Sequence, residues 1–130
     1  MTAQDAQKMN ALDPRFSEQF FIEMNVKAVT YLARELRYTY QWAGESHERA
    51  IRMRIFKAQD GRSAISGVEM AFTKKEADAS GKPQCHLDHI WTCKEAATAV
   101  WVGVLSYEAA ARRLWSRDNI RQITKAENHR

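Results

Sequence analysis

Residues 83–105, PQCHLDHIWTCKEAATAVWVGVL, contain the pattern on which the fold class depends. Their apolar residues recur at intervals of three and four over more than twenty positions of the chain, which predicts a helix that begins near Pro83. The first part of the stretch also alternates, with less polar side chains at every second position: Cys85, Leu87, His89, Trp91 and Cys93. Alternation is typical of a strand. The stretch therefore favours a helix and leaves a strand at residues 85–93 as the alternative.

A second long helix is predicted upstream, from Pro14 to Trp42. Asp13 can cap its start, and proline suits the first helical position. The apolar residues that follow spread over most of the circumference of this helix. Such a helix is expected to be central in its fold or buried in an oligomer. Residues 1–12 are polar and aperiodic, and we expect them to form a loose tail.

Three glycine-containing breaks separate the expected elements. Each glycine is followed within two residues by one that can begin a helix: Gly44 by Ser46, Gly61 by Ser63, and Gly81 by Pro83. This order predicts an all-α fold, a four- or five-helix bundle, as a single domain over residues 13–130. The alternative is an α+β fold with a three-stranded antiparallel sheet between two long helices, its strands at residues 49–57, 63–73 and 85–93.

Composition limits the class of protein. A chain of 130 residues, 45% hydrophobic and 28% charged, fits one globular domain. Two cysteines are too few for a disulfide framework. The start of the chain lacks a basic region followed by an apolar run, and the longest apolar run, residues 99–105, is far shorter than the roughly 20 residues of a membrane span. These features predict a soluble, cytoplasmic protein without a membrane partner.

The densest group of reactive side chains lies within residues 85–93. On a helix, Cys85, His89 and Cys93 would form one row, in which only two neighbours could bind the same metal ion. The sequence has no CxxC pair, no Gly-rich phosphate loop and no paired carboxylates. A nucleophilic cysteine would also need a base oriented by a third group. We therefore expect a non-enzymatic protein with no catalytic residues, no cofactor and no bound metal.

Basic residues are concentrated in two segments. Residues 49–62 contain five basic residues against one acid, and residues 112–130 contain six against two. Arginine matches the geometry of phosphate, and aromatic residues interleaved with arginine suit base stacking. Both segments therefore predict contacts with DNA or RNA. The predicted nucleic-acid-binding residues are Arg49, Arg52, Arg54, Lys57, Arg62, Arg112, Arg113, Arg117, Asn119, Arg121 and Lys125.

Residues 105–122, LSYEAAARRLWSRDNIRQ, resemble a helix-turn-helix DNA-binding motif. In that family the first helix often reads Ser-x-Glu-x-Ala-Ala-x-x-Leu, and the second opens with Ser-Arg. The resemblance covers residues 105–125 only. It implies a first helix at Tyr107–Leu114 and a recognition helix at Arg117–Lys125, with four side chains facing DNA: Ser116, Arg117, Asn119 and Arg121. One continuous helix from residue 84 with an Arg-rich end explains the same residues.

Two functions follow from these patterns. The first is a small basic nucleic-acid-binding protein, either an accessory subunit of a nucleoprotein complex or a small regulator. The alternative is a protein-binding adaptor or inhibitor, of the kind that phages and plasmids encode, which docks on an acidic partner surface. Trp42 and Trp115 are the predicted partner-binding residues, because tryptophan commonly anchors protein interfaces. The widely apolar first helix adds the expectation of a homo-oligomer.

Overall fold

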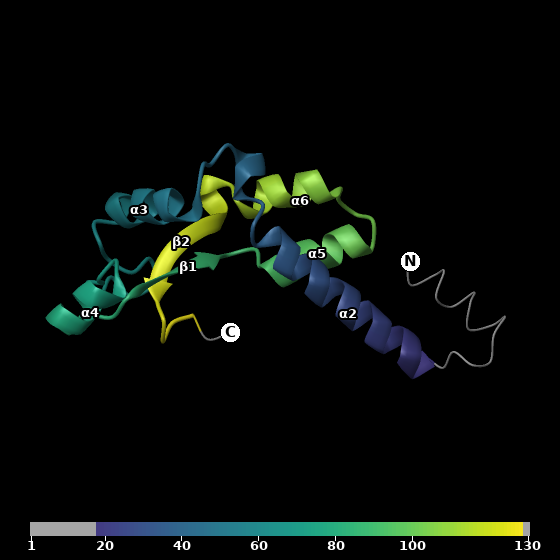
Figure 1. Ribbon diagram of the computed structural model, residues 1–130, viewed down its shortest axis with the longest axis horizontal. Helices are drawn as coiled ribbons and strands as arrows, with labels where there is room; N and C mark the ends of the chain where they lie inside the picture. The colour runs from purple at the N-terminus through teal and green to yellow at the C-terminus, as the bar shows by residue number, and fades with distance from the viewer. Residues whose placement is uncertain (1–17, 129–130) are drawn as a thin grey trace.

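The computed structural model describes residues 18–128 and shows a mixed α+β fold (Figure 1). Its elements, in order, are α2 (Glu18–Leu36), the 3-10 helix η1 (Tyr40–Ala43), α3 (Glu48–Ala58), α4 (Lys74–Ser80), β1 (Cys85–His89), α5 (Cys93–Trp101), α6 (Tyr107–Leu114), the 3-10 helix η2 (Arg117–Asn119) and β2 (Ile120–Thr124). Within these residues, five α-helices accompany a two-stranded antiparallel sheet. The predicted all-α bundle is therefore wrong, and the fold class is that of the α+β alternative.

Only one of the three strands in that alternative forms, β1 within residues 85–93. Residues 49–57 lie in α3, which begins where Nδ1 of His47 accepts a hydrogen bond from the Ala50 N–H at 3.1 Å. Helix wins here because Ile51 and Ile55, one turn apart, both reach the core. Residues 63–73 form a loop tied to its neighbours by isolated bridges.

The long helix expected from Pro83 is divided between a strand and two helices. Thr92 ends the extended segment with a capping box: its hydroxyl accepts a hydrogen bond from the Glu95 N–H at 3.1 Å, and the Glu95 carboxylate accepts one from the Thr92 N–H at 3.3 Å. Gly103, with φ of 80°, then separates α5 from α6. The spacing of three and four thus arises from two elements in succession rather than from one helix.

The segment that resembles a helix-turn-helix folds as predicted only in its first half. Helix α6 occupies Tyr107–Leu114, with the Ser106 hydroxyl accepting a hydrogen bond from the Ala109 N–H. The expected recognition helix at Arg117–Lys125 does not form, because these residues make η2 and then β2. Pairing with β1, more than thirty residues upstream, overrides the local helical pattern.

Helix α2 is shorter than the sequence predicts, ending at Leu36 instead of Trp42. Trp42 lies in η1, which Gly44 ends with a left-handed φ of 82°. The cap at Asp13 and the tail at 1–12 lie outside the described residues, as do both ends of the predicted domain. None of the described helices is both long and apolar enough to cross a membrane.

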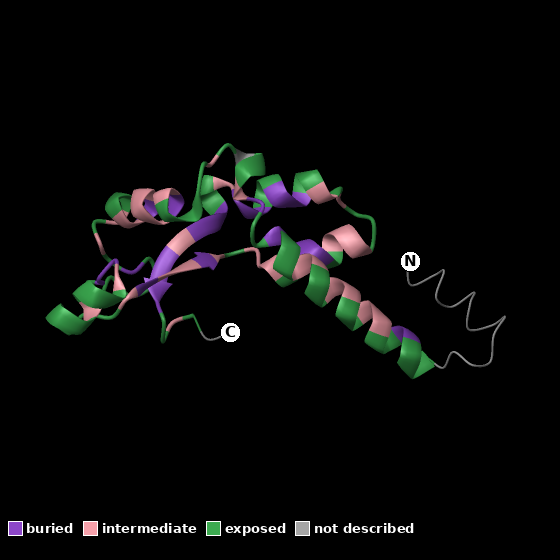
Figure 2. Ribbon diagram, in the orientation of Figure 1, coloured by how far each residue is buried: buried purple, intermediate pink, exposed green. Residues whose placement is uncertain are grey.

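The main core lies where α5, α6, β2 and the end of α2 meet. Small buried residues on α5 and α6, such as Ala97 and Ala110, allow these helices to approach closely. Trp115 is 2% exposed, and its indole N–H donates to the Leu36 carbonyl at 3.1 Å. Figure 2 shows the buried residues gathered around this junction, whereas most of α2 is exposed or half-buried. A smaller cluster around Phe72 packs beneath α3.

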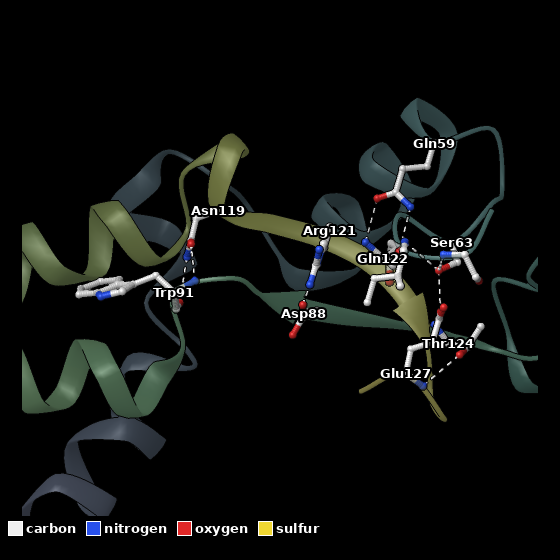
Figure 3. A network of polar contacts seen from close by, with 11 residues as sticks. Gln59, Ser63, Asp88, Trp91, Asn119, Arg121, Gln122, Thr124 and Glu127 are labelled. Carbon is white, nitrogen blue, oxygen red and sulfur yellow. Dashed lines mark hydrogen bonds and ion pairs between the residues drawn. The ribbon is translucent and has the colours of Figure 1, made fainter. Parts of the chain in front are cut away.

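Side chains close the outer edge of β2. The Gln59 amide accepts a hydrogen bond from the Gln122 N–H and donates one to the Gln122 carbonyl, both at 2.9 Å (Figure 3). Nearby, the Glu127 carboxylate accepts hydrogen bonds from the Ser63 hydroxyl at 2.6 Å and the Thr124 N–H at 2.9 Å. These donors lower the pKa of Glu127 to about 2. The edge of β2 that faces away from β1 is therefore already occupied at Gln122 and Thr124.

Candidate binding cleft along β1

A cleft of about 680 Å³ runs along β1. Its lining comes from elements that lie far apart in the sequence. Helix α2 contributes Ala33, the turn after it contributes Arg37, helix α3 contributes Glu48 and Arg52, and the start of α5 contributes Thr92 to Lys94. All five residues of β1 also line it, and Trp115 and Asn128 complete the lining. The volume falls in the range of ordinary ligand sites, roughly 300–1,000 Å³.

The backbone of β1 presents a free edge to this cleft. In the ladder with β2, the Ile90 N–H donates to the Asn119 carbonyl at 2.9 Å, and Asp88 stands opposite Arg121. Because hydrogen-bonded pairs alternate along an antiparallel ladder, Leu87 and His89 direct their N–H and C=O groups away from β2. Within residues 18–128, no hydrogen-bond partner meets these four groups.

Cys85 shows that this edge of β1 can hydrogen-bond to an adjacent segment of the polypeptide. Its N–H, which also points away from β2, donates to the Ala71 carbonyl at 2.9 Å. The loop that carries Ala71 thereby forms a single parallel bridge beside Gln84. The contact ends before Leu87, so that the remaining part of the edge stays open.

Three cations line the cleft, each from a different part of the chain: the turn after α2, helix α3 and the start of α5. Arg37 and Lys94 are exposed and Arg52 is half-buried. Two acids also line it, but Asp88, only 6% exposed, accepts a hydrogen bond and ion pair from Nε of Arg121 at 2.9 Å (Figure 3). Since Arg121 neutralises Asp88, Glu48 is the remaining acid among the described residues that line the cleft. The lining therefore has an excess of positive charge.

The cysteines and histidines of the cleft are held in their neutral forms. Burial raises the pKa of both thiols, although a guanidinium opposes it in each case, Arg52 at Cys85 and Arg37 at Cys93. A protonated thiol is a poor nucleophile and a poor metal ligand. The two cysteines lie on a strand and at a helix start, so the helical row of potential metal ligands is not formed. No group of metal-binding side chains occurs among the described residues.

His89 is fixed by the core on one side of its ring. Its Nδ1 lies 2.9 Å from the Leu114 carbonyl, which requires the proton on Nδ1, and the ring meets Trp115 edge-on with centroids 4.5 Å apart. Burial lowers the pKa of His89, and the Leu114 carbonyl only partly offsets this. A neutral ring with its proton on Nδ1 leaves Nε2 as a hydrogen-bond acceptor.

Four of the predicted nucleic-acid-binding residues are ion-paired. Each guanidinium forms an ion pair with a carboxylate of this chain: Arg54 with Glu45, Arg62 with Glu69 at 3.2 Å, Arg112 with Glu108 at 2.9 Å, and Arg121 with Asp88 at 2.9 Å. A phosphate that approached these arginines would also approach the carboxylates. Their contribution to an anion-binding surface is reduced accordingly.

Three other predicted residues stack on aromatic rings. The guanidinium carbons of Arg49 and Arg52 lie 5.6 and 5.4 Å from the centre of the Phe72 ring, and that of Arg113 lies 4.1 Å from the centre of the Trp91 ring. These distances are those of cation–π contacts. The rings orient the arginines and leave their charge uncancelled, and Arg52 points its charge toward Cys85 in the cleft.

Asn119 is unavailable to a partner, because it is 8% exposed and joins β2 to the residues before α5. Its side chain accepts a hydrogen bond from the Trp91 N–H at 2.7 Å and donates to the carbonyls of Trp91 and Leu114 (Figure 3). The remaining predicted residues, Lys57, Arg117 and Lys125, are exposed and make no ion pair with a described residue.

The two basic segments meet at β2, where Gln122 is hydrogen-bonded to Gln59 and to the Arg52 carbonyl, but the helices α3 and α6 within them lie apart. In Figure 1, α3 and α6 lie toward opposite ends of the sheet, with η1 and the start of β2 between them. Of the two predicted partner-binding tryptophans, Trp115 is buried in the core. Trp42 is 41% exposed and contacts the Tyr107 ring edge-on, with centroids 5.4 Å apart. Only Trp42 can meet a partner in this structure.

Sequence reasoning missed the charged residues that the fold brings to the cleft, Arg37 and Lys94. Neither belongs to a basic cluster in the sequence. One local signal was available, because Thr92 and Glu95 have the spacing of a capping box. A capping box marks the start of a helix, so the alternating residues before Thr92 would lie outside that helix and could form a strand. A free edge, in contrast, depends on which strand pairs with β1.

Comparisons of the chain with models of protein families, with curated proteins and with solved structures give no match.

Proposed function

We propose that the protein is a non-enzymatic adaptor or inhibitor that holds an acidic segment of a partner protein in the cleft along β1. The observation that carries this proposal is the convergence of Arg37, Arg52 and Lys94, from three separate parts of the chain, around a cleft whose own buried acid is neutralised by Arg121. Cations gathered in this way attract an anionic partner and set its position.

Two features favour an acidic protein over nucleic acid as the partner. The arginines expected to bind phosphate are largely ion-paired or stacked on aromatic rings, and the helices α3 and α6, which carry five of them, lie apart. The cleft also combines its cations with apolar lining from Ala33 and Leu87. A mixed apolar and cationic lining suits the side chains of a peptide better than a phosphate backbone.

The neutral side chains of the cleft support a binding role. Burial keeps the thiols of Cys85 and Cys93 protonated, and His89 uses Nδ1 to bind the Leu114 carbonyl. A nucleophile in this cleft would need a thiolate with a base beside it. The groups instead provide a fixed surface of hydrogen-bond donors, acceptors and positive charge.

The proposal is tested by fluorescence anisotropy with labelled Glu-rich, Lys-rich and uncharged peptides, alongside single- and double-stranded DNA and RNA. We expect the Glu-rich peptide to bind, and more weakly at about 200 mM than at 50 mM salt. The double variant Arg37→Glu/Lys94→Glu should weaken this binding at least about tenfold, or about 1.4 kcal/mol. Its matched control is Lys57→Glu/Arg117→Glu, which changes the net charge equally outside the cleft and should retain most of the affinity.

A different result would show that the partner is nucleic acid and not an acidic protein. If oligonucleotides bind, lose about a thousandfold affinity between the two salt concentrations, and are released by the Lys57→Glu/Arg117→Glu variant, the protein neutralises several phosphates outside the cleft. Equal loss of peptide binding in the two double variants would show that only net charge matters, and would contradict a specific site.

A further inference from the structure

We infer that the partner binds by adding a β-strand to the free edge of β1, with acidic side chains four positions apart and an apolar residue midway between them. This inference rests on the proposed function and specifies the form of the partner. It is argued from the backbone groups of Leu87 and His89, from the positions of Arg52 and Arg37 near the two ends of β1, and from the side chains that cover part of the outer edge of β2.

The free edge supplies the hydrogen bonds of strand addition. Leu87 and His89 present two N–H and two C=O groups that point away from β2 and line the cleft. Proteins protect such edges with Pro, Lys, bulges or a covering segment, because an open edge is a template for another chain. The β2 edge is covered by Gln59 and Glu127, whereas the edge at Leu87 and His89 has no cover within the described residues. The longer open edge for an extended peptide is therefore the one along β1.

The cations fix the spacing of acidic residues in the added strand. Arg52 and Arg37 both line the cleft. The positive charge of Arg52 lowers the pKa of Cys85 and His86 at one end of β1, and that of Arg37 lowers the pKa of His89 and Cys93 at the other end. These ends are about 13 Å apart, at about 3.3 Å for each residue. Side chains of a strand return to the same face at every second residue. The pattern that matches is therefore acid–x–apolar–x–acid, with the apolar residue beside Leu87.

The same charges argue against a second copy of this chain as the added strand. Pairing of β1 with β1 of another molecule would bring Arg37, Arg52 and Lys94 of both copies to one interface. Like charges brought together in this way cost binding free energy. An acidic strand, in contrast, removes the repulsion among the three cations. The partner that fits the edge is therefore an anionic extended segment rather than another copy.

Backbone N-methylation of a peptide tests strand addition, since it removes a hydrogen-bond donor and leaves the side-chain charges unchanged. The probe is a fluorescein-labelled peptide containing Glu-Thr-Val-Thr-Glu. One version is N-methylated at the central valine, and the other at both threonines, because alternate residues of a strand direct their N–H groups to opposite edges. We expect one version to lose at least about tenfold in affinity and the other to bind within about threefold of the parent peptide.

Which of the two methylated peptides loses affinity also shows whether the added strand runs antiparallel or parallel to β1. Sensitivity at the valine indicates antiparallel addition opposite Leu87, and sensitivity at the threonines indicates parallel addition. Equal affinity of both methylated peptides would overturn strand addition, while loss in the Arg37→Glu/Lys94→Glu variant would still support an acidic partner. If the parent peptide fails to bind and every longer Glu-rich peptide also fails, the proposed function itself is contradicted. Dimerisation of the protein at micromolar concentration, abolished by the parent peptide, would assign the edge to a second copy.

Discussion

At the scale of the residue, Trp115 decides how the core is closed. It is 2% exposed, donates to the Leu36 carbonyl, and contacts the rings of Tyr40 and His89. Replacing Trp115 with alanine should lower the free energy of unfolding by about 3–5 kcal/mol, because a large cavity remains. Urea denaturation measures this. Trp42→Ala is the control, with an expected cost of about 1 kcal/mol from its exposed ring contact with Tyr107. Similar costs for the two variants would contradict the assigned burial.

His89 makes stability depend on pH, also at the residue scale. Burial lowers its pKa in the folded state, so the unfolded chain binds a proton at a higher pH than the folded protein does. The free energy of unfolding should therefore be highest, as far as His89 contributes, above about pH 6.5, and should fall as the pH drops below that value. Denaturation midpoints measured from pH 8 to 5 give the slope. His89→Asn retains an N–H donor for Leu114 and should reduce the slope, leaving the part due to His86, whose pKa burial also lowers. An unchanged slope would exclude His89 as its source.

At the scale of the element, the Thr92 capping box sets the boundary between β1 and α5. Thr92→Ala should lower the free energy of unfolding by about 1 kcal/mol, since the start of α5 loses an N-cap. Thr98→Ala, on the exposed middle of the same helix, should leave stability unchanged or slightly raised, because alanine has the higher helix propensity. Thermal unfolding of the two variants compares them directly. A larger loss for Thr98→Ala would show that the cap does not stabilise α5.

At the scale of the whole molecule, the cleft exists only because distant segments fold together. Its lining spans Ala33 to Asn128 and draws on α2, α3, β1 and α5. In Figure 1 the arginines of α3 and those of α6 belong to helices that lie apart, although β2, from the second basic segment, packs against α3. Positive charge from outside the two basic segments, at Arg37 and Lys94, is brought to the cleft. The surface that can bind a partner is thus a property of the packing rather than of any segment.

Local rules account for part of this fold. Gly44 and Gly81 end η1 and α4 in the left-handed conformation, and Ser106 caps α6 as its position indicates. The alternation of residues 85–93 is a correct strand signal that the helical spacing of the longer stretch outweighed. The recognition helix expected after Ser116 failed because the pattern of residues 117–125 is compatible with either state. Pairing with β1 then decided between them.

Local sequence features account for the stops at Gly44 and Gly81, the cap at Ser106, the excess of basic residues and the small number of reactive groups. Each of these depends on residue type or on neighbours within a few positions. Three features depend on packing: residues 120–124 are a strand, Arg121 neutralises Asp88, and one edge of β1 has no strand partner among residues 18–128. The physical reason is that strand pairing and ion pairing join residues more than thirty positions apart, and a free edge is defined by which of those pairings the fold completes.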